Sequence, residues 1–207
     1  VVPSGSAMVG LLFGGATFLL LCWLGRWGGV VIGVALIALV MLLPVFFQRG
    51  PSPADLIERV PSLSSSGQHR LYIWDFTSQR IAEKPLTGWG FDSSRSIPGG
   101  NAPAPVGASL LPLHPHNAAL QVWLELGFPG ALLMAALFGY GFIWRPGGAN
   151  SSPYAAARGA MLITLTGSAM LSYGVWQNWW VASMWLLPAV FDAVNGRQSN
   201  DHTKPSG

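Results

Sequence analysis

The run GVVIGVALIALVMLLPVFF, residues 29–47, decides the fold class of this chain. It contains no charged or polar side chain. A helix rises about 1.5 Å per residue, so a helix of this length reaches across most of the roughly 30 Å of hydrocarbon in a bilayer. We therefore expect residues 29–47 to form a transmembrane helix.

Four more apolar runs flank this one, at residues 6–24, 128–144, 158–173 and 175–194. The short turn at residues 25–28 would join the first two runs into an antiparallel hairpin over residues 1–47. The whole chain has 51% hydrophobic and only 9% charged side chains, too little charge to cover a soluble globule. We predict an all-α polytopic membrane protein with about five transmembrane helices.

Positively charged side chains between the runs predict the orientation in the membrane. Counted in order, one side of the membrane receives Arg26, Arg145, Arg158, Arg197 and Lys204. By the positive-inside rule this side is cytoplasmic, and it includes the loop 145–157 and the tail 195–207. The net charge of +3 is scattered along the chain, so no nucleic-acid partner is expected. The single cysteine, Cys22, has no partner for an internal disulfide.

The polar segment 48–113 would then face outward as a long loop, a length that is usually functional or disordered. Residues 65–68, Ser-Ser-Gly-Gln, fit a capping box and predict an amphipathic helix over residues 68–83, on or near the membrane surface. Residues 86–91 mix aromatic side chains with glycines, which is typical of a sharp, partly buried turn. Residues 93–111 are rich in Ser, Gly, Pro and Ala and are expected to be mobile.

Ionisable side chains gather at His114-Pro115-His116-Asn117, directly before the apolar run that extends back from residues 128–144 to Ala118. Pro115 suits the first position of a helix, which would place His116 in the first turn of a helix within residues 114–144. The positive end of the helix dipole favours neutral imidazole, the form that can accept a proton, and it can also attract a phosphate. The pattern therefore predicts a general base at His116.

A polar ridge follows the two histidines. Asn117, Gln121 and Glu125 are spaced four residues apart and would share one helix face, where they could bind a sugar. Two alternatives remain open from spacing alone. The histidines could be solvated residues at the end of a membrane helix, or His114 and His116 could bind zinc with further ligands from the loop.

Arg70 lies in the first turn of the predicted amphipathic helix, on the same face as Trp74. Its charge opposes the helix dipole there, which is useful opposite an anionic ligand but equally typical of an arginine reaching for solvent. Arg80, Lys84 and Arg95 are expected to be solvated surface residues.

Arg70-Leu71-Tyr72-Ile73-Trp74, followed by His116-Asn117, nine variable residues, Gly127 and Gly130, resembles a pattern of the O-antigen ligase and polymerase superfamily. The His-to-Gly spacing is fairly specific, whereas the arginine element alone is only supportive. The resemblance covers residues 4–194. In it, Gly127 and Gly130 form a structural motif.

The resemblance implies a multi-pass enzyme of the bacterial inner membrane with a GT-C-like fold and a periplasmic long loop. It implies transfer of a glycan from an undecaprenyl diphosphate carrier to a hydroxyl of lipid A core, with no metal and no cofactor. His116 would activate the acceptor, and Arg70 would stabilise the diphosphate. Expected substrate-binding residues are His114, Asn117, Gln121, Glu125 and Trp74.

The chain departs from the family pattern in two ways. Members usually have ten or more membrane helices, so the N-terminal half, expected to be a partner of this chain, is missing. Members also often carry an arginine where residues 4–7 read Ser-Gly-Ser-Ala. An O-antigen or exopolysaccharide polymerase is the alternative activity, and a non-catalytic membrane transporter or scaffold is the alternative class.

Overall fold

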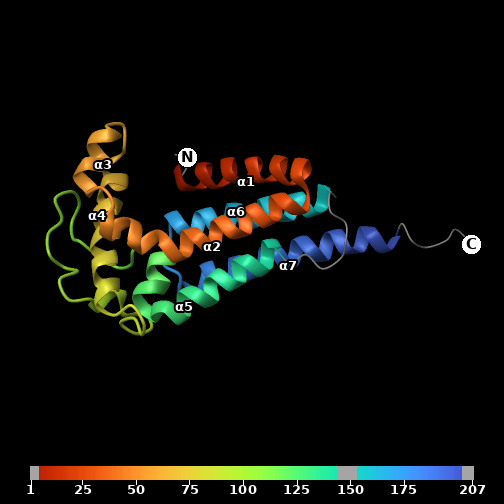
Figure 1. Ribbon diagram of the computed structural model, residues 1–207. Helices are drawn as coiled ribbons and strands as arrows, with labels where there is room; N and C mark the ends of the chain where they lie inside the picture. Colours follow the sequence, from red (N-terminus) through yellow and green to blue (C-terminus); the bar gives the residue numbers. More distant parts are fainter. Residues whose placement is uncertain (1–4, 144–152, 202–207) are drawn as a thin grey trace, which may run out of the picture. The chain divides into compact units, whose positions relative to one another are not determined.

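The structure is a computed structural model that describes residues 5–143 and 153–201. Arg145, Lys204 and Ser4, which carry part of the topology and family arguments, lie outside these residues. The described chain is entirely helical, so the predicted all-α class is confirmed (Figure 1). Its elements are α1 Gly5–Leu24, α2 Arg26–Arg49, α3 Pro53–Arg59, α4 Ser65–Glu83, the 3-10 helix η1 Ser93–Ser96, α5 Ala118–Ile143, α6 Pro153–Leu171 and α7 Asn178–Asp201.

Three of the described helices are long and apolar enough to cross a membrane, namely α1, α2 and α5. The chain is therefore a membrane protein with three clear candidate spans. The other two expected spans correspond to α6 and α7, which carry more polar side chains, including Thr164, Ser168 and Asp192. The count of five spans stays a prediction, as does the orientation.

The chain forms two compact units. Among the described residues, the first comprises residues 5–30, 153–168 and 176–201. Within it, Gly14 of α1 lies so close to α6 that a Cβ atom there would come within 2.2 Å of the Thr164 hydroxyl. Small residues let two membrane helices approach closely. Close van der Waals packing matters there because lipid provides no hydrophobic driving force between helices. An ion pair of 3.2 Å between Arg158 and Asp192 joins α6 to α7.

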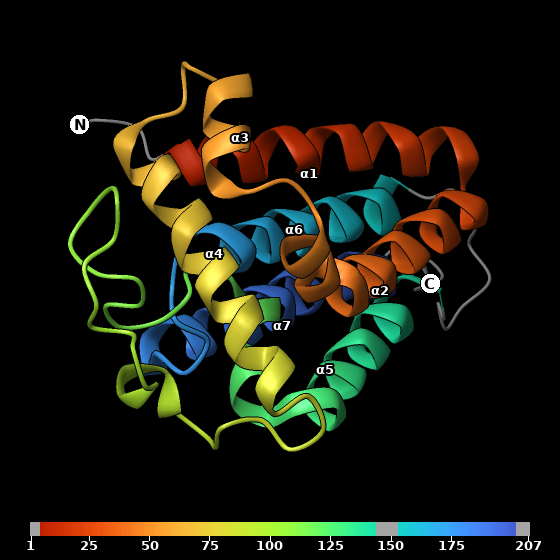
Figure 2. The ribbon, with the colours of Figure 1, turned by 60° about the vertical axis from the view of Figure 1, so that its left-hand side comes forward.

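Among the described residues, the second unit comprises residues 31–143 and 169–175 and contains all of the predicted site residues. The indole N–H of Trp123 on α5 donates to the Val40 carbonyl of α2 over 2.7 Å. Helix α4 crosses the ends of α2 and α5 (Figures 1 and 2). The Gln48 amide of α2 donates to the Ser78 carbonyl of α4 over 2.8 Å, which fastens this crossing.

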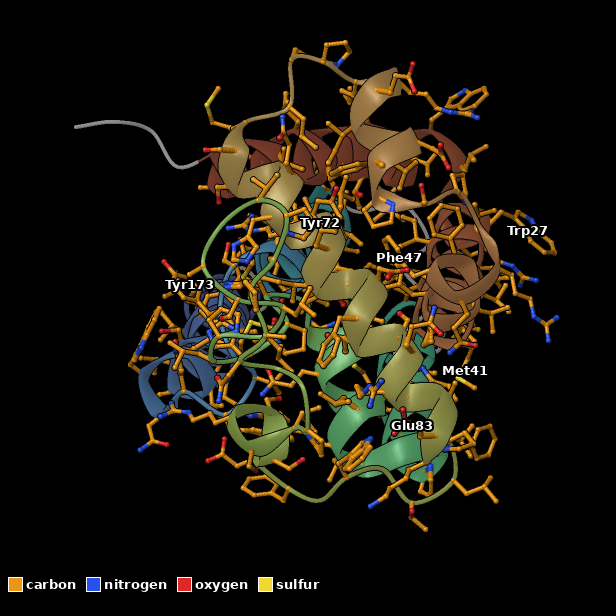
Figure 3. The ribbon with its side chains drawn as sticks, turned by 90° about the vertical axis from the view of Figure 1, so that its left-hand side faces the viewer. Trp27, Met41, Phe47, Tyr72, Glu83 and Tyr173 are labelled. Carbon is orange, nitrogen blue, oxygen red and sulfur yellow. The ribbon has the colours of Figure 1, made fainter. Side chains whose placement is uncertain are left out.

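Figure 3 looks onto α4, with Phe47 of α2 on one side of it and Tyr173 on the other. Phe47 also packs edge-on against the Trp74 ring, with the ring centroids 5.7 Å apart. The buried face of α4, which includes Ile73 and Ile81, packs inside this unit, and α4 contacts α5. The amphipathic pattern of this helix is thus used for packing within the protein.

Helix α4 begins three residues earlier than the sequence pattern predicts, at Ser65, and its cap differs. The Ser64 hydroxyl accepts from the Gly67 N–H over 3.2 Å, while the Gln68 side chain donates to the Leu63 carbonyl. The predicted capping box at residues 65–68 is therefore wrong. A capping box does exist between Ser52 and Asp55, where it starts α3, a helix that the pattern does not predict.

The segment 93–111 has a defined path, contrary to the mobility expected from its composition. Leu111 and Ile97 are buried, and the Leu111 N–H donates to the Gly100 carbonyl over 2.8 Å. The Leu110 N–H donates to the Ala102 carbonyl over 2.9 Å, which closes the loop between them. Figure 2 shows this loop beside α4. Two buried apolar anchors and these ladder-like hydrogen bonds offset the flexible composition.

Candidate functional site

Helix α5 is broken at Gly127, whose φ of 63° and ψ of −157° are essentially restricted to glycine. Pro129 contributes to the break because it has no N–H to offer the Glu125 carbonyl. The turn after α4 supplies the missing partners. The Trp89 N–H donates to the Leu124 carbonyl over 2.8 Å, and the Gly90 N–H donates to the Glu125 carbonyl over 2.9 Å. The turn at residues 85–90, in which Gly88 is buried, therefore closes the broken helix.

Two glycines allow this close approach. A Cβ atom on Gly127 would lie 2.6 Å from the Leu86 carbonyl oxygen, and one on Gly88 would lie 2.4 Å from the Glu125 carbonyl oxygen. Gly88 also has a φ of 66°, in the region that favours glycine. On Gly130, a Cβ atom would overlap the Leu126 side chain at 2.4 Å. The spacing Gly127-x-x-Gly130 thus has a backbone explanation, the kink in α5.

His116 lies just before α5 and not inside its first turn. The helix starts at Ala118, and the Asn117 side chain caps it by accepting from the Leu120 N–H over 3.0 Å. The predicted helix start at Pro115 is therefore wrong, because Asn117 offers a side-chain acceptor for an orphan N–H at the helix end. His116 has a φ of 54°, an uncommon left-handed conformation for a residue other than glycine.

The hydrogen bonds of the two imidazoles determine where their protons lie. His116 Nδ1 is 2.8 Å from the Ser172 carbonyl oxygen, which can only accept, so the proton is on Nδ1 and the neutral ring has its lone pair on Nε2. The His116 backbone N–H donates to His114 Nδ1 over 3.2 Å. Neutral His114 therefore carries its proton on Nε2. The ring centroids are 4.2 Å apart.

Both imidazoles are held in the neutral form. Burial lowers the pKa of His114 to about 4, with further lowering by the charges of His116, Arg95 and Arg70. Burial also lowers the pKa of His116, as do the charges of Arg70 and His69, whereas the hydrogen bond to Ser172 raises it. A neutral His116 at pH 7 can accept a proton at Nε2.

The charge of Arg70 lowers the pKa of both imidazoles, so its guanidinium lies within electrostatic range of each, while its role at the site stays a prediction. Arg70 is half-buried, and this burial lowers the pKa of its guanidinium. Arg95 and His69 also belong to this neighbourhood, although the pattern gave no reason to single out either residue. The His69 ring nitrogen Nε2 is 2.7 Å from the Ser109 carbonyl. Nothing in a single sequence reveals such contacts between distant loop residues.

The polar ridge of α5 faces into the protein. Gln121 and Glu125 are 2% and 0% exposed, and the Gln121 amide donates to a Glu125 carboxyl oxygen over 3.0 Å. Asn117 is the helix cap, and the Trp74 indole N–H donates to the Pro115 carbonyl over 2.8 Å. These four side chains thus have protein partners, and the direct binding of substrate that the pattern suggests for them stays a prediction.

Among residues 5–143 and 153–201, no three His, Cys, Asp or Glu side chains gather as metal ligands would. The two histidines and the arginines instead form a group of hydrogen-bond donors and one proton acceptor, suited to an anion and a hydroxyl. Such a group can stabilise a leaving diphosphate and accept a proton from an attacking oxygen.

Residues 3–135 match the family model described as O-antigen ligase, a stretch that includes Arg70, His116 and both motif glycines. The chain belongs to the O-antigen ligase family. Ser172 lies outside the matched stretch, so the partner of the His116 ring comes from a part of the chain that the family model does not cover.

Relatives in Rickettsia support the same assignment. The chain is 34% identical to an inferred polysaccharide ligase of Rickettsia felis in an alignment of 197 residues that covers 90% of this chain and 47% of the relative. Inferred polysaccharide ligases of Rickettsia conorii and Rickettsia prowazekii are 33% and 35% identical, each over 90% of this chain and 46% and 47% of the relative. The chain thus spans about half the length of these curated relatives. No solved structure matches it, and a GT-C-like fold stays a prediction.

Proposed function

We propose that this chain contributes the catalytic residues of a glycosyltransferase that joins a diphosphate-linked glycan to an acceptor hydroxyl. The observation that carries the proposal is the fixed ring of His116. Its Nδ1 is 2.8 Å from the Ser172 carbonyl, so the basic lone pair is on Nε2, and Arg70 lies nearby. A base for the acceptor and a cation for the leaving group are the two needs of this reaction.

The proposed step balances without a metal or a redox partner. The acceptor oxygen attacks the anomeric carbon and gives its proton to Nε2 of His116. The bond from that carbon to the phosphate oxygen breaks, and its electron pair leaves with the diphosphate. The guanidinium of Arg70 donates to the diphosphate oxygens, and the Nε2–H of His114 offers a further donor.

The donor is proposed to be an undecaprenyl diphosphate glycan, and the acceptor lipid A core, at the periplasmic face of the bacterial inner membrane. Three apolar helices support a lipid-embedded donor, and the charges counted along the sequence support the outward position of the loop. The names of the Rickettsia proteins favour ligation over polymerisation. We further propose that a missing N-terminal half is the partner of this chain, which is supported by the coverage of only 47% of the Rickettsia felis relative.

The test is a transfer assay with the complete protein in liposomes that contain the lipid-linked donor and a lipid A core acceptor. His116→Ala should abolish transfer while the protein still inserts and binds donor. Thr77→Val is a matched control, because the buried Thr77 hydroxyl has no hydrogen-bond partner in the structure. Full transfer by His116→Ala would refute the proposal, and lengthening of the donor glycan without labelling of the core would assign a polymerase instead.

A further inference from the structure

Glu125 joins three parts of the second unit. Its carboxyl group accepts from the Asp92 N–H over 2.9 Å, from the Ser94 hydroxyl, and from the Gln121 amide over 3.0 Å. The side chain is fully buried on α5. Asp92 and Ser94 lie at η1, so the carboxyl group attaches η1 to α5. A buried polar group with this many partners fixes the position of everything bonded to it.

Gln121 connects Glu125 to a segment far along the chain, residues 172–175. A side-chain amide donates from its nitrogen and accepts at its oxygen. The Gln121 side-chain nitrogen donates to Glu125. The Gln121 side-chain oxygen therefore points the other way, where it accepts from the Val175 N–H over 2.9 Å. Glu125 therefore sets the orientation in which Gln121 can hold Val175.

The segment that Gln121 holds also contains the partner of His116. Ser172, three residues before Val175, presents the carbonyl that accepts from His116 Nδ1 over 2.8 Å. Between them, Gly174 lies against the His114 ring, where a Cβ atom would be 3.0 Å from its Cδ2. The position of residues 172–175 thus decides whether the His116 ring keeps its lone pair on Nε2.

We propose that Gln121 and Glu125 are positioning residues, which hold residues 172–175 so that the Ser172 carbonyl keeps the lone pair of His116 on Nε2. The inference rests on the proposed role of His116 as a base. Glu125 also accepts from the Ser94 hydroxyl, and this bond holds η1, which carries Arg95. The charge of Arg95 lowers the pKa of His114. One buried carboxyl group thus helps to position both the proposed base, His116, and the neighbouring cation, Arg95.

The experiment measures the pH dependence of transfer by Gln121→Leu in the complete protein. Leucine keeps most of the volume but cannot hold Val175. We expect kcat to fall about fivefold to tenfold, the effect of one net hydrogen bond, with the KM for donor unchanged. The Ser172 contact raises the pKa of His116, so its loss should also move the acid limb of the kcat/KM profile, which reports the free enzyme, to lower pH.

Glu125→Gln is the second variant. It replaces one acceptor oxygen by an NH2 group, which would face one of the donors that now bond to Glu125. It should lower kcat and move the acid limb in the same direction. The pH at the midpoint of the acid limb does not depend on how much of the protein folds, so a poor yield of folded protein does not change it. Thr77→Val should leave both the rate and the limb as in the wild type.

The outcomes separate the inference from the proposed function. If His116→Ala abolishes transfer while Gln121→Leu and Glu125→Gln keep the wild-type limb, the positioning role is refuted and the proposed function stands. Reduced activity with an unshifted limb refutes it as well, since that is the effect of a merely structural residue. Full transfer by His116→Ala refutes the proposed function itself.

Discussion

Replacing Gly127 by alanine should destabilise the protein by about 2–5 kcal/mol. The backbone at Gly127 has a φ of 63° and a ψ of −157°, a region that costs a residue with a Cβ atom about 1–3 kcal/mol. The new methyl group would also lie 2.6 Å from the Leu86 carbonyl oxygen and 2.7 Å from the Gly88 nitrogen. Relief of that overlap requires the turn at residues 85–90 to move away from α5.

The movement would weaken the hydrogen bonds that close the break in α5. The bonds from Trp89 to the Leu124 carbonyl and from Gly90 to the Glu125 carbonyl are 2.8 and 2.9 Å long, and each contributes about 0.5–1.5 kcal/mol. Thermal unfolding of the purified protein in detergent should show a midpoint lower by roughly 4–20 °C, by the scaling for proteins of this size.

Gly141→Ala is the matched control, since Gly141 is on the same helix and a Cβ atom there meets nothing within 4 Å. Alanine is a better helix former than glycine by up to about 1 kcal/mol, so this variant should be neutral or slightly more stable. If Gly127→Ala unfolds at the same temperature as Gly141→Ala, the reasoning about the kink is refuted.

Three further predictions concern the site. Arg70→Lys should lower kcat/KM for the donor by about tenfold or more, because an ammonium cannot bind two phosphate oxygens side by side, and equal kinetics would argue against a diphosphate contact. The kcat/KM profile of the wild type, which reports the free enzyme, should keep most of its value at pH 7 and lose it with a midpoint below 6.5, since burial lowers the pKa of His116 and keeps its ring neutral to lower pH; a midpoint above 6.5 would contradict this. Trp74→Phe removes the 2.8 Å hydrogen bond to the Pro115 carbonyl and should lower the transfer rate by a factor of about two to ten, measured against Thr77→Val. An unchanged rate would show that this bond from α4 does not position the histidines.

Apolar length and charge alone predict the helical membrane class, because a bilayer accepts few other structures. The proximity of Arg70 and His116 could also be anticipated, but from family spacing and not from physical chemistry. Pro115 misled the prediction of the helix start, since a proline suits that position in general, whereas the side chain of Asn117 makes the actual cap.

The remaining features depend on contacts between residues far apart in the chain. Ser172 and His116 are 56 residues apart, and Ser94 and Glu125 are 31 apart. No periodicity or local motif encodes such pairs. The ridge Asn117, Gln121 and Glu125 illustrates the difficulty. The four-residue spacing does join Gln121 to Glu125, but Asn117 caps the helix, and the orientation of these side chains toward the protein interior depends on loops whose paths the sequence does not reveal.

The most direct test of the central claim is the single-turnover transfer rate of His116→Gln as a function of pH. Glutamine can still donate to the Ser172 carbonyl but has no basic nitrogen, so folding and donor binding should persist. We predict a rate about 10²- to 10⁴-fold below the wild type, with no acid limb left in the residual activity. A rate within threefold of the wild type, or an acid limb at the wild-type midpoint, would show that His116 is not the base.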